Sequence, residues 1–254
     1  RWLKDEANGI DAEPMLRVWM QDSVPPTTQY SHRPGRWVAE EQWPPPDLKP
    51  REYGLSGSGW LVAGAVEADE SECILRSPLS VGLYAGKWCS YAAGPDLAYD
   101  QREEDGGALV FETLPLEEAV EILGRPQLEL EFRVDRPVAM VAVRLSDVAP
   151  DGRATRVTYG LLNLTHRDGA EQPEPLEPGR RYRVQVRMND IGQGFPVGHR
   201  IRLSLSTSYW PLAWPPPEPV EMRVYPTRSM LRLPVRKPRP GDSALAPFAP
   251  PEAA

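Results

Sequence analysis

Proline occupies 30 of the 254 positions and recurs along most of the chain. Because proline lacks a backbone N–H donor and interrupts helices, long helices are excluded over most of the sequence. Between the prolines lie short segments in which apolar and polar residues alternate, which is the pattern of half-buried β-strands. With 20 glycines available for turns, the pattern indicates an all-β fold built as an antiparallel β-sandwich.

The clearest strand is predicted over residues 200–206. Ile201, Leu203 and Leu205 alternate there with polar side chains, so one face of the strand should lie in a core. Further strands are expected within 15–21, 54–66 (around residues 60–62), 73–75, 127–134, 138–145, 155–164, 181–188, 220–224 and 229–233, together with a short strand that ends at Gly124, and long loops are expected within 22–50 and 76–107. This spacing of strands and turns predicts one sandwich domain.

Charge and composition exclude several functions. The formal net charge is −7 and the arginines are dispersed, which argues against a nucleic-acid partner. No apolar run is long enough for a membrane helix and no signal peptide opens the sequence, so we predict a cytoplasmic protein without a membrane partner. Cys73 and Cys89 match no metal-binding spacing and are expected to be reduced. Calcium at the acidic residues 96–105 is a weaker alternative, because Arg102 lies among them. We therefore predict no metal and no cofactor.

A catalytic triad cannot be assembled from these residues. An α/β-hydrolase needs a Gly-x-Ser-x-Gly turn between a strand and a helix. The nearest candidate, residues 54–58, lacks the final glycine and precedes a strand-like run. His32, His166 and His199 are the only histidines, and no serine is placed to give the order serine, acid, histidine. The chain alone is predicted to be inactive.

Five motifs, in this order, resemble the C-terminal β-sandwich of the cocaine-esterase / X-prolyl dipeptidyl peptidase (CocE/NonD-type) serine hydrolases. They are Trp2-Leu3-Lys4, Trp43-Pro44, Asp100-Gln101-Arg102, the Asp-Val-Ala-Pro-Asp-Gly run at 147–152, and the stretch from Gly198 to Pro211. The resemblance implies a jelly-roll-like (galactose-binding-like) sandwich over residues 13–235. Residues 1–12 would be a short helical remnant that ends an upstream α/β-hydrolase domain, and residues 236–254 a poorly packed Pro/Ala-rich tail.

The resemblance also implies a function for the chain. It would be the non-catalytic domain of an acyl esterase or X-Pro dipeptidyl peptidase, docked on its own upstream α/β-hydrolase domain, walling the substrate pocket and aiding assembly into a homo-oligomer. The pocket wall would come from Leu83, Tyr84, Trp88 and Tyr91. The docking or structural motif residues would be Trp43, Asp100, Arg102, Asp147, Asp151, Gly198, His199, Arg200, Ser208 and Pro211, with His199 hydrogen-bonded at the start of its strand.

A second hypothesis belongs to another class. The chain could be a free-standing jelly-roll module that binds carbohydrate or peptide, because its loops are rich in aromatic residues such as Trp37 and Trp214 and also carry acidic residues. The loop aromatics could equally be core packing. Binding to soluble polysaccharides, lost on Trp→Ala substitution in the loops, distinguishes this hypothesis.

Overall fold

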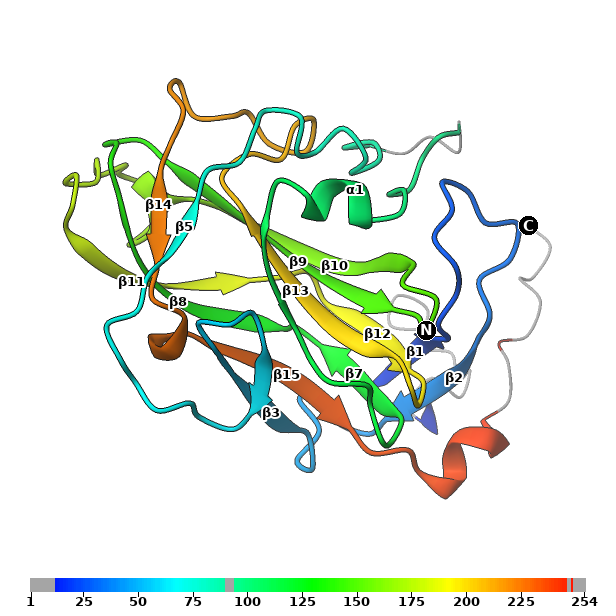
Figure 1. Cartoon of the computed structure of the whole chain (residues 1–254). Helices are drawn as coiled ribbons and strands as arrows, with labels where there is room; N and C mark the ends of the chain where they lie inside the picture. The colour runs from blue at the N-terminus through cyan, green and yellow to red at the C-terminus, as the bar shows by residue number, and fades with distance from the viewer. Residues whose placement is uncertain (1–11, 90–93, 246–247, 249–254) are drawn as a thin grey trace.

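The computed structural model describes residues 12–89, 94–245 and 248. Two β-sheets pack face to face (Figure 1), so the predicted all-β sandwich is confirmed. The helix expected at the start of the chain lies outside the described residues up to residue 11. No helix in the described part is long and apolar enough to cross a membrane.

The larger sheet contains eleven strands within the described residues. They are β1 (Leu16–Gln21), β2 (Gly35–Glu40), β3 (Lys49–Leu55), β4 (Leu61–Ala63), β5 (Cys73–Leu75), β7 (Val120–Gly124), β8 (Gln127–Val134), β11 (Arg181–Arg187), β12 (Ile191–Phe195), β14 (Met222–Val224) and β15 (Met230–Arg236). Their order is β2-β1-β12-β7-β15-β8-β14-β5, with β11 on β8, β3 on β15 and β4 on β3. The β1–β12 pair is parallel and the other strand pairs are antiparallel.

The smaller sheet contains β6 (Leu109–Glu112), β9 (Met140–Val148), β10 (Ala154–Asn163) and β13 (Arg200–Ser206), in the order β10-β9-β13-β6. One short α-helix, α1 (Arg102–Asp105), precedes β6. Three 3₁₀ turns, η2 (Leu164–His166), η3 (Pro226–Arg228) and η4 (Pro240–Ala244), complete the regular structure of the described residues.

The main core lies between the two sheets. Ile201, Leu203 and Leu205 of β13 are fully buried in it, as their alternation predicts. Phe111 of β6 and Phe132 of β8 meet them from the two sheets. Each such side chain contributes roughly 1.5–3 kcal/mol through burial, so this core accounts for the sandwich arrangement.

A second apolar cluster covers the outer face of the smaller sheet. Every residue of β9 is buried, because Val141 and Val143 face the main core while Met140 and Ala142 face the second cluster. The covering side chains come from two loops and include Val81, Ala85, Tyr209 and Leu212. The long loop expected over residues 76–107 is therefore mostly irregular, as predicted, but it is packed against the sheet.

Several strands were not predicted, among them β3, which lies mostly before the strand expected around residues 60–62. The expected loop 22–50 contains β2, whose apolar residues Trp37, Val38 and Ala39 are consecutive and do not alternate. β12 carries Gly192 and Gly194, which have low strand propensity. A Cβ atom at Gly192 would lie 3.0 Å from Cγ1 of Val18 on the neighbouring strand, so close packing with β1 favours glycine there.

Part of the expected tail is attached to the larger sheet, although residues 237, 238, 240 and 241 are exposed. Arg236 ends β15 and its side chain is only 2% exposed. It pairs with Glu40 of β2 at 2.7 Å and with Asp242 of η4 at 2.6 Å. The packing was missed because the segment contains little apolar surface and is held by charge instead.

An ion-pair network crosses the outer face of the larger sheet. Its members are Glu52, Glu70, Glu72, Glu129, Glu131 and Glu221 with Arg76, Arg133, Arg181, Arg183, Arg223, Arg228 and Arg232. Opposite charges on adjacent strands stabilise a sheet, although an exposed pair contributes only about 0–1 kcal/mol. Glu72 has the most partners, since it binds Arg133 at 2.8 Å, Arg223 at 3.1 Å and the hydroxyl of Tyr225 at 2.6 Å.

Glu72→Gln is expected to lower the melting temperature at neutral pH and to flatten its acid dependence. Hydrogen bonds from Arg133 and Tyr225 lower the pKa of Glu72 from its ordinary value of 4.5 to about 2. Because the folded-state pKa is depressed, the contribution of Glu72 is present above pH 4.5 and is lost as the pH falls towards about 2. Thermal melts across this interval, with Glu171→Gln as the exposed control, measure the effect. An unchanged acid slope in Glu72→Gln contradicts the prediction.

Candidate functional site

Two loops that touch each other expose several large apolar side chains, and we call this surface the loop platform. Its members are Leu79, Leu83, Tyr84 and Trp88 of one loop and Trp210 and Trp214 of the other. The most exposed are Trp88 at 76% and Trp214 at 81%. The ring centres of Trp210 and Trp214 lie 4.6 Å apart. A group of exposed apolar side chains of this kind is typical of an interaction surface.

A buried carboxylate fixes the backbone of the loop platform. Glu104 of α1 is 1% exposed. Its two carboxylate oxygens accept hydrogen bonds from the backbone N–H groups of Gly82 at 2.6 Å and Tyr84 at 2.7 Å. Hydrogen bonds to a charged acceptor are stronger than neutral ones. The segment that carries Leu83 is therefore held in one conformation.

The helix that carries Glu104 is itself clamped to the smaller sheet. Asp105 pairs with Arg202 of β13 at 2.7 Å and with the fully buried Arg144 of β9 at 3.2 Å, and it accepts a hydrogen bond from Ser204 at 2.7 Å. Arg144 also donates to the side chain of Gln101 at 3.0 Å. These contacts connect the loop platform to the core of the fold (Figure 1), where α1 lies beside the smaller sheet.

The residues expected to form a pocket wall lie on this surface. Leu83, Tyr84 and Trp88 are all exposed members of the loop platform. Tyr84 also packs edge-on against Tyr99 with ring centres 5.5 Å apart. Tyr91 lies outside the described residues. Trp210 and Trp214 were not among the predicted pocket-wall residues, because only the folded chain brings the loop at 210–214 beside Gly82.

Two of the predicted acidic residues form local arginine pairs. Asp100 binds Arg102 at 2.7 Å and accepts a hydrogen bond from the backbone N–H of Ala154. Burial raises the pKa of Asp100, but the hydrogen bonds from Arg102 outweigh it, so that the pKa is lowered. Asp151 binds the side chain of Arg153 in an exposed turn, and this bond lowers the pKa of Asp151. Within the acidic cluster, Asp100 and Asp105 pair with arginines and Glu104 binds backbone amides, and no three potential metal ligands gather in the described part of the chain.

Asp147 and His199 are neighbours, but they do not form a catalytic triad. Oδ1 of Asp147 lies 2.8 Å from Nδ1 of His199, while Oδ2 accepts a hydrogen bond from the hydroxyl of Ser23. The carboxylate stands between serine and histidine, so the histidine cannot take the serine proton as a general base. This arrangement joins the loop at Ser23 to β9 and to the start of β13.

The remaining predicted residues are dispersed over the fold. Gly198 turns the chain before β13 with φ +79°, and Arg200 pairs with Glu112 at 2.8 Å. Ser208 is buried, and Pro211 follows Trp210 in the second loop. Trp43 packs over Gly124, beside an apolar groove on the larger sheet. Ser56 bonds to the backbone N–H of Trp60 in a turn between β3 and β4. The structure brings Asp147 and His199 together, but the other predicted motif residues do not join them in one site.

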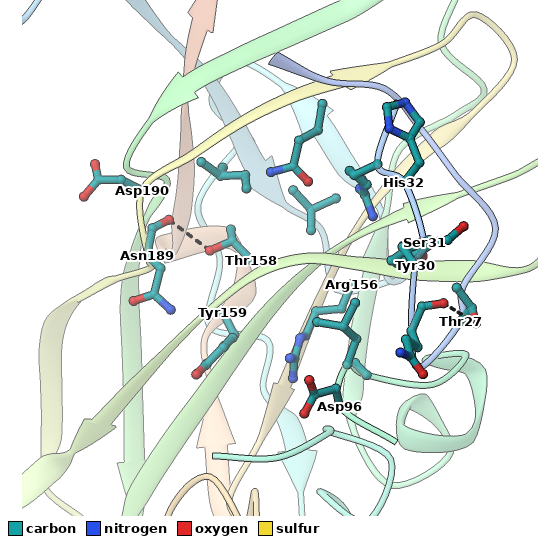
Figure 2. A pocket seen from close by; sticks show the side chains of 18 residues that line it. Thr27, Tyr30, Ser31, His32, Asp96, Arg156, Thr158, Tyr159, Asn189 and Asp190 are labelled. Carbon is teal, nitrogen blue, oxygen red and sulfur yellow. Dashed lines mark hydrogen bonds between the residues drawn. The ribbon is translucent and has the colours of Figure 1, made fainter. Parts of the chain in front are cut away.

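A cavity of about 560 Å³, which we call the polar cavity, opens next to the smaller sheet (Figure 2). Its labelled lining comes from the loop 27–32, from Asp96, from Arg156, Thr158 and Tyr159 of β10, and from Asn189 and Asp190. The hydroxyl of Thr158 donates to the carbonyl of Asn189 at 2.9 Å. Sequence reasoning missed this cavity, since its lining is divided among segments that lie far apart in the chain, chiefly residues 27–33 and 155–159.

Comparison with known proteins gives consistent matches. The model of the family described as X-Pro dipeptidyl-peptidase C-terminal non-catalytic domain matches residues 8–239. Cocaine esterase of Rhodococcus sp. (strain MB1 Bresler) is 25% identical over 222 residues, which is 83% of this chain but only 37% of that protein. The chain thus spans well under half the length of this relative.

Two solved structures share the fold. An aminopeptidase from the marine sediment archaeon Thaumarchaeota archaeon has a TM-score of 0.68 at 19% identity, and an α-amino acid ester hydrolase has a TM-score of 0.67 at 22% identity. Each match covers 80% of this chain and 39% of the other.

Proposed function

The chain belongs to the X-Pro dipeptidyl-peptidase C-terminal non-catalytic domain family, and from this premise we propose that it completes the substrate pocket of a longer serine hydrolase. In this role it docks on an upstream α/β-hydrolase domain that carries the catalytic triad. The loop platform walls the pocket. The observation that supports the proposal is a set of exposed apolar side chains on a backbone fixed by the buried Glu104.

Fixed loops are well suited to this task. Because Gly82 and Tyr84 are already hydrogen-bonded to Glu104, docking would not incur the entropy cost of ordering their backbone. Burial of Trp88 and Trp214 against a partner would contribute roughly 25 cal/mol for each Å² of apolar surface removed from water. An aromatic wall favours an apolar acyl or prolyl group, so we propose esters or X-Pro peptides as the substrates of the whole protein.

Two further proposals concern the state of the protein. We propose that the whole enzyme acts in the cytoplasm and that this domain contributes to a homo-oligomer. Cell fractionation tests the first proposal. Sedimentation of the whole enzyme, with and without this domain, tests the second.

The proposed function is tested by reconstitution. The chain and the separately expressed upstream region are assayed alone and together with p-nitrophenyl acetate and Gly-Pro-p-nitroanilide. The chain alone should show no turnover, and the upstream region should turn over substrate faster when the chain is added. Turnover by the chain alone would mean that it contains its own nucleophile, and the proposal would then be wrong.

Replacing both Leu83 and Trp88 by alanine is expected to lower kcat/KM of the reconstituted enzyme at least tenfold. The change removes two exposed apolar side chains of the loop platform, and a tenfold loss corresponds to about 1.4 kcal/mol of transition-state stabilisation. Trp60→Ala is the matched control, because Trp60 is also an exposed tryptophan (46%) but lies outside the loop platform. Equal kcat/KM values in the double variant and the unmodified enzyme would exclude the platform as a pocket wall.

A further inference from the structure

We propose that the polar cavity is a binding site for a small organic carboxylate. This inference does not rest on the proposed function, because it concerns a different surface and requires no partner domain.

Almost every arginine in the described residues is paired with a carboxylate within 4.0 Å. The exceptions within the described ranges are Arg33, Arg156 and Arg187. Arg33 and Arg156 both line the polar cavity. Among the described residues, these two arginines share one cavity and neither has a carboxylate within 4.0 Å, so the cavity offers two guanidinium groups to an external anion.

Arg156 is held in position without losing its charge. Its Nη1 donates to the hydroxyl of the buried Tyr209 at 2.8 Å, and its guanidinium lies over the ring of Tyr159 at 4.7 Å. Both partners are neutral, and burial raises the pKa of Tyr209, which keeps that hydroxyl protonated. Figure 2 shows Arg156 and Tyr159 among the side chains that surround the cavity. The guanidinium is therefore pre-oriented for a ligand.

Arg33 is held in a similar way. Its Nη2 donates to the side-chain oxygen of Gln193 at 3.1 Å, and its guanidinium lies 5.0 Å from the ring centre of Tyr30. Its Nε is buried and has no hydrogen-bond partner among the described residues. The Nε atoms of Arg133, Arg136, Arg144 and Arg202 are buried and unsatisfied as well, so it is the position of Arg33 on the cavity that makes its guanidinium available to a ligand.

The acidic side chains of the cavity do not cancel these charges. Asp190 lines the cavity but pairs with Arg125 at 2.6 Å. Asp96 adds one negative charge beside Arg33 and Arg156, and Asp22 and Asp147 attract Arg33 from beyond the 4.0 Å of an ion pair. A carboxylate matches the guanidinium fork in shape and charge. The polar side chains of Gln29 and Asn189 and the rings of Tyr30 and Tyr159 can contact the rest of a ligand the size of an acylated amino acid or a sugar acid.

The experiment uses two pairs of probes that differ mainly in the carboxylate. The 254-residue chain is titrated by calorimetry with N-acetyl-tyrosine and its amide, and with glucuronate and glucose. At least one carboxylate should bind at least tenfold more tightly than its neutral counterpart. The pair that shows the difference tells whether the body of the ligand resembles an amino acid or a sugar.

Arginine variants locate the binding. Arg156→Met and Arg33→Met should each weaken binding of the carboxylate at least tenfold. Arg187→Met is the matched control, since Arg187 is an exposed residue of β11 that also lacks a carboxylate within the described residues but lies outside the cavity. Thermal melts check that each variant folds. Should Arg156→Met fail to fold, Arg156→Lys keeps the charge and removes the fork, and a loss of binding is still expected.

Three results would overturn the inference. The first is no binding of either carboxylate at about millimolar concentration. The second is equal affinity for the charged and neutral members of both pairs. The third is unchanged affinity in folded Arg33→Met together with folded Arg156→Met or Arg156→Lys.

Discussion

Asp105→Ala is expected to lower the free energy of unfolding by about 3–5 kcal/mol, the cost of removing one partner from a buried ion pair. The side chain of Arg144 is fully buried and that of Arg202 is only 12% exposed, and both pair with Asp105. The hydroxyl of the buried Ser204 would also lose its acceptor. Without Asp105, two arginines retain their charge in a region of low water access, and α1 loses its clamp to the sheet.

Urea denaturation of the variant and the unmodified chain measures this loss. Asp151→Asn is the matched control, because the Asp151–Arg153 pair is about half exposed on both sides and should contribute only about 0–1 kcal/mol. Asp105→Asn separates charge from size, since it keeps the shape of the side chain. Arg202 also pairs with Glu112 at 3.1 Å, and Arg144 also bonds to Gln101, so a loss below about 1 kcal/mol for Asp105→Ala would show that these remaining contacts are sufficient.

Gly82→Ala is expected to destabilise the chain by about 3 kcal/mol and to separate the two loops of the platform. Gly82 has φ +118°, a conformation that L side chains rarely adopt. An added Cβ would overlap the carbonyl oxygen of Trp210 and lie 2.5 Å from its backbone nitrogen. Backbone strain and overpacking each cost about 1–3 kcal/mol, and the rigid backbone of Trp210 offers no flexible side chain to move aside.

Denaturant unfolding, limited proteolysis and tryptophan fluorescence report the effect. We expect faster cleavage within residues 79–88 and, in the reconstituted enzyme, loss of the activation by the chain. Gly152→Ala is the control: Gly152 has φ +88° but a Cβ there meets nothing within 4 Å, so it reports backbone strain alone at about 1 kcal/mol. If Gly82→Ala unfolds at the same urea concentration as Gly152→Ala, the close approach of the two loops does not stabilise the fold.

The strands that could be predicted are those whose own residues alternate. β8 was predicted at its observed bounds, Gln127–Val134, because Leu128, Leu130, Phe132 and Val134 all face the main core. β2 and β12 were missed because one has consecutive apolar residues and the other has glycines, and only their neighbours make them strands.

The candidate site was predictable only in part. Leu83, Tyr84 and Trp88 were named from a resemblance, and the structure places them on an exposed loop. Trp210 and Trp214 are recognisable in the sequence as loop aromatics, but nothing local places them beside these residues or Glu104 beneath. The polar cavity had no signal at all, because its lining comes from distant segments of the chain.

The sequence by itself determined that this chain is an all-β sandwich without a recognisable catalytic triad, since strand periodicity and the absence of a motif are local properties. β13 shows what it left open. Its apolar residues face the core, as their period of two requires. Arg202 and Ser204 lie on the polar face, where α1 covers them and both bind Asp105. The alternating pattern would fit a solvent-exposed polar face equally well. Only the tertiary structure decided these partners, because the environment of a charged side chain depends on which distant segments pack against it.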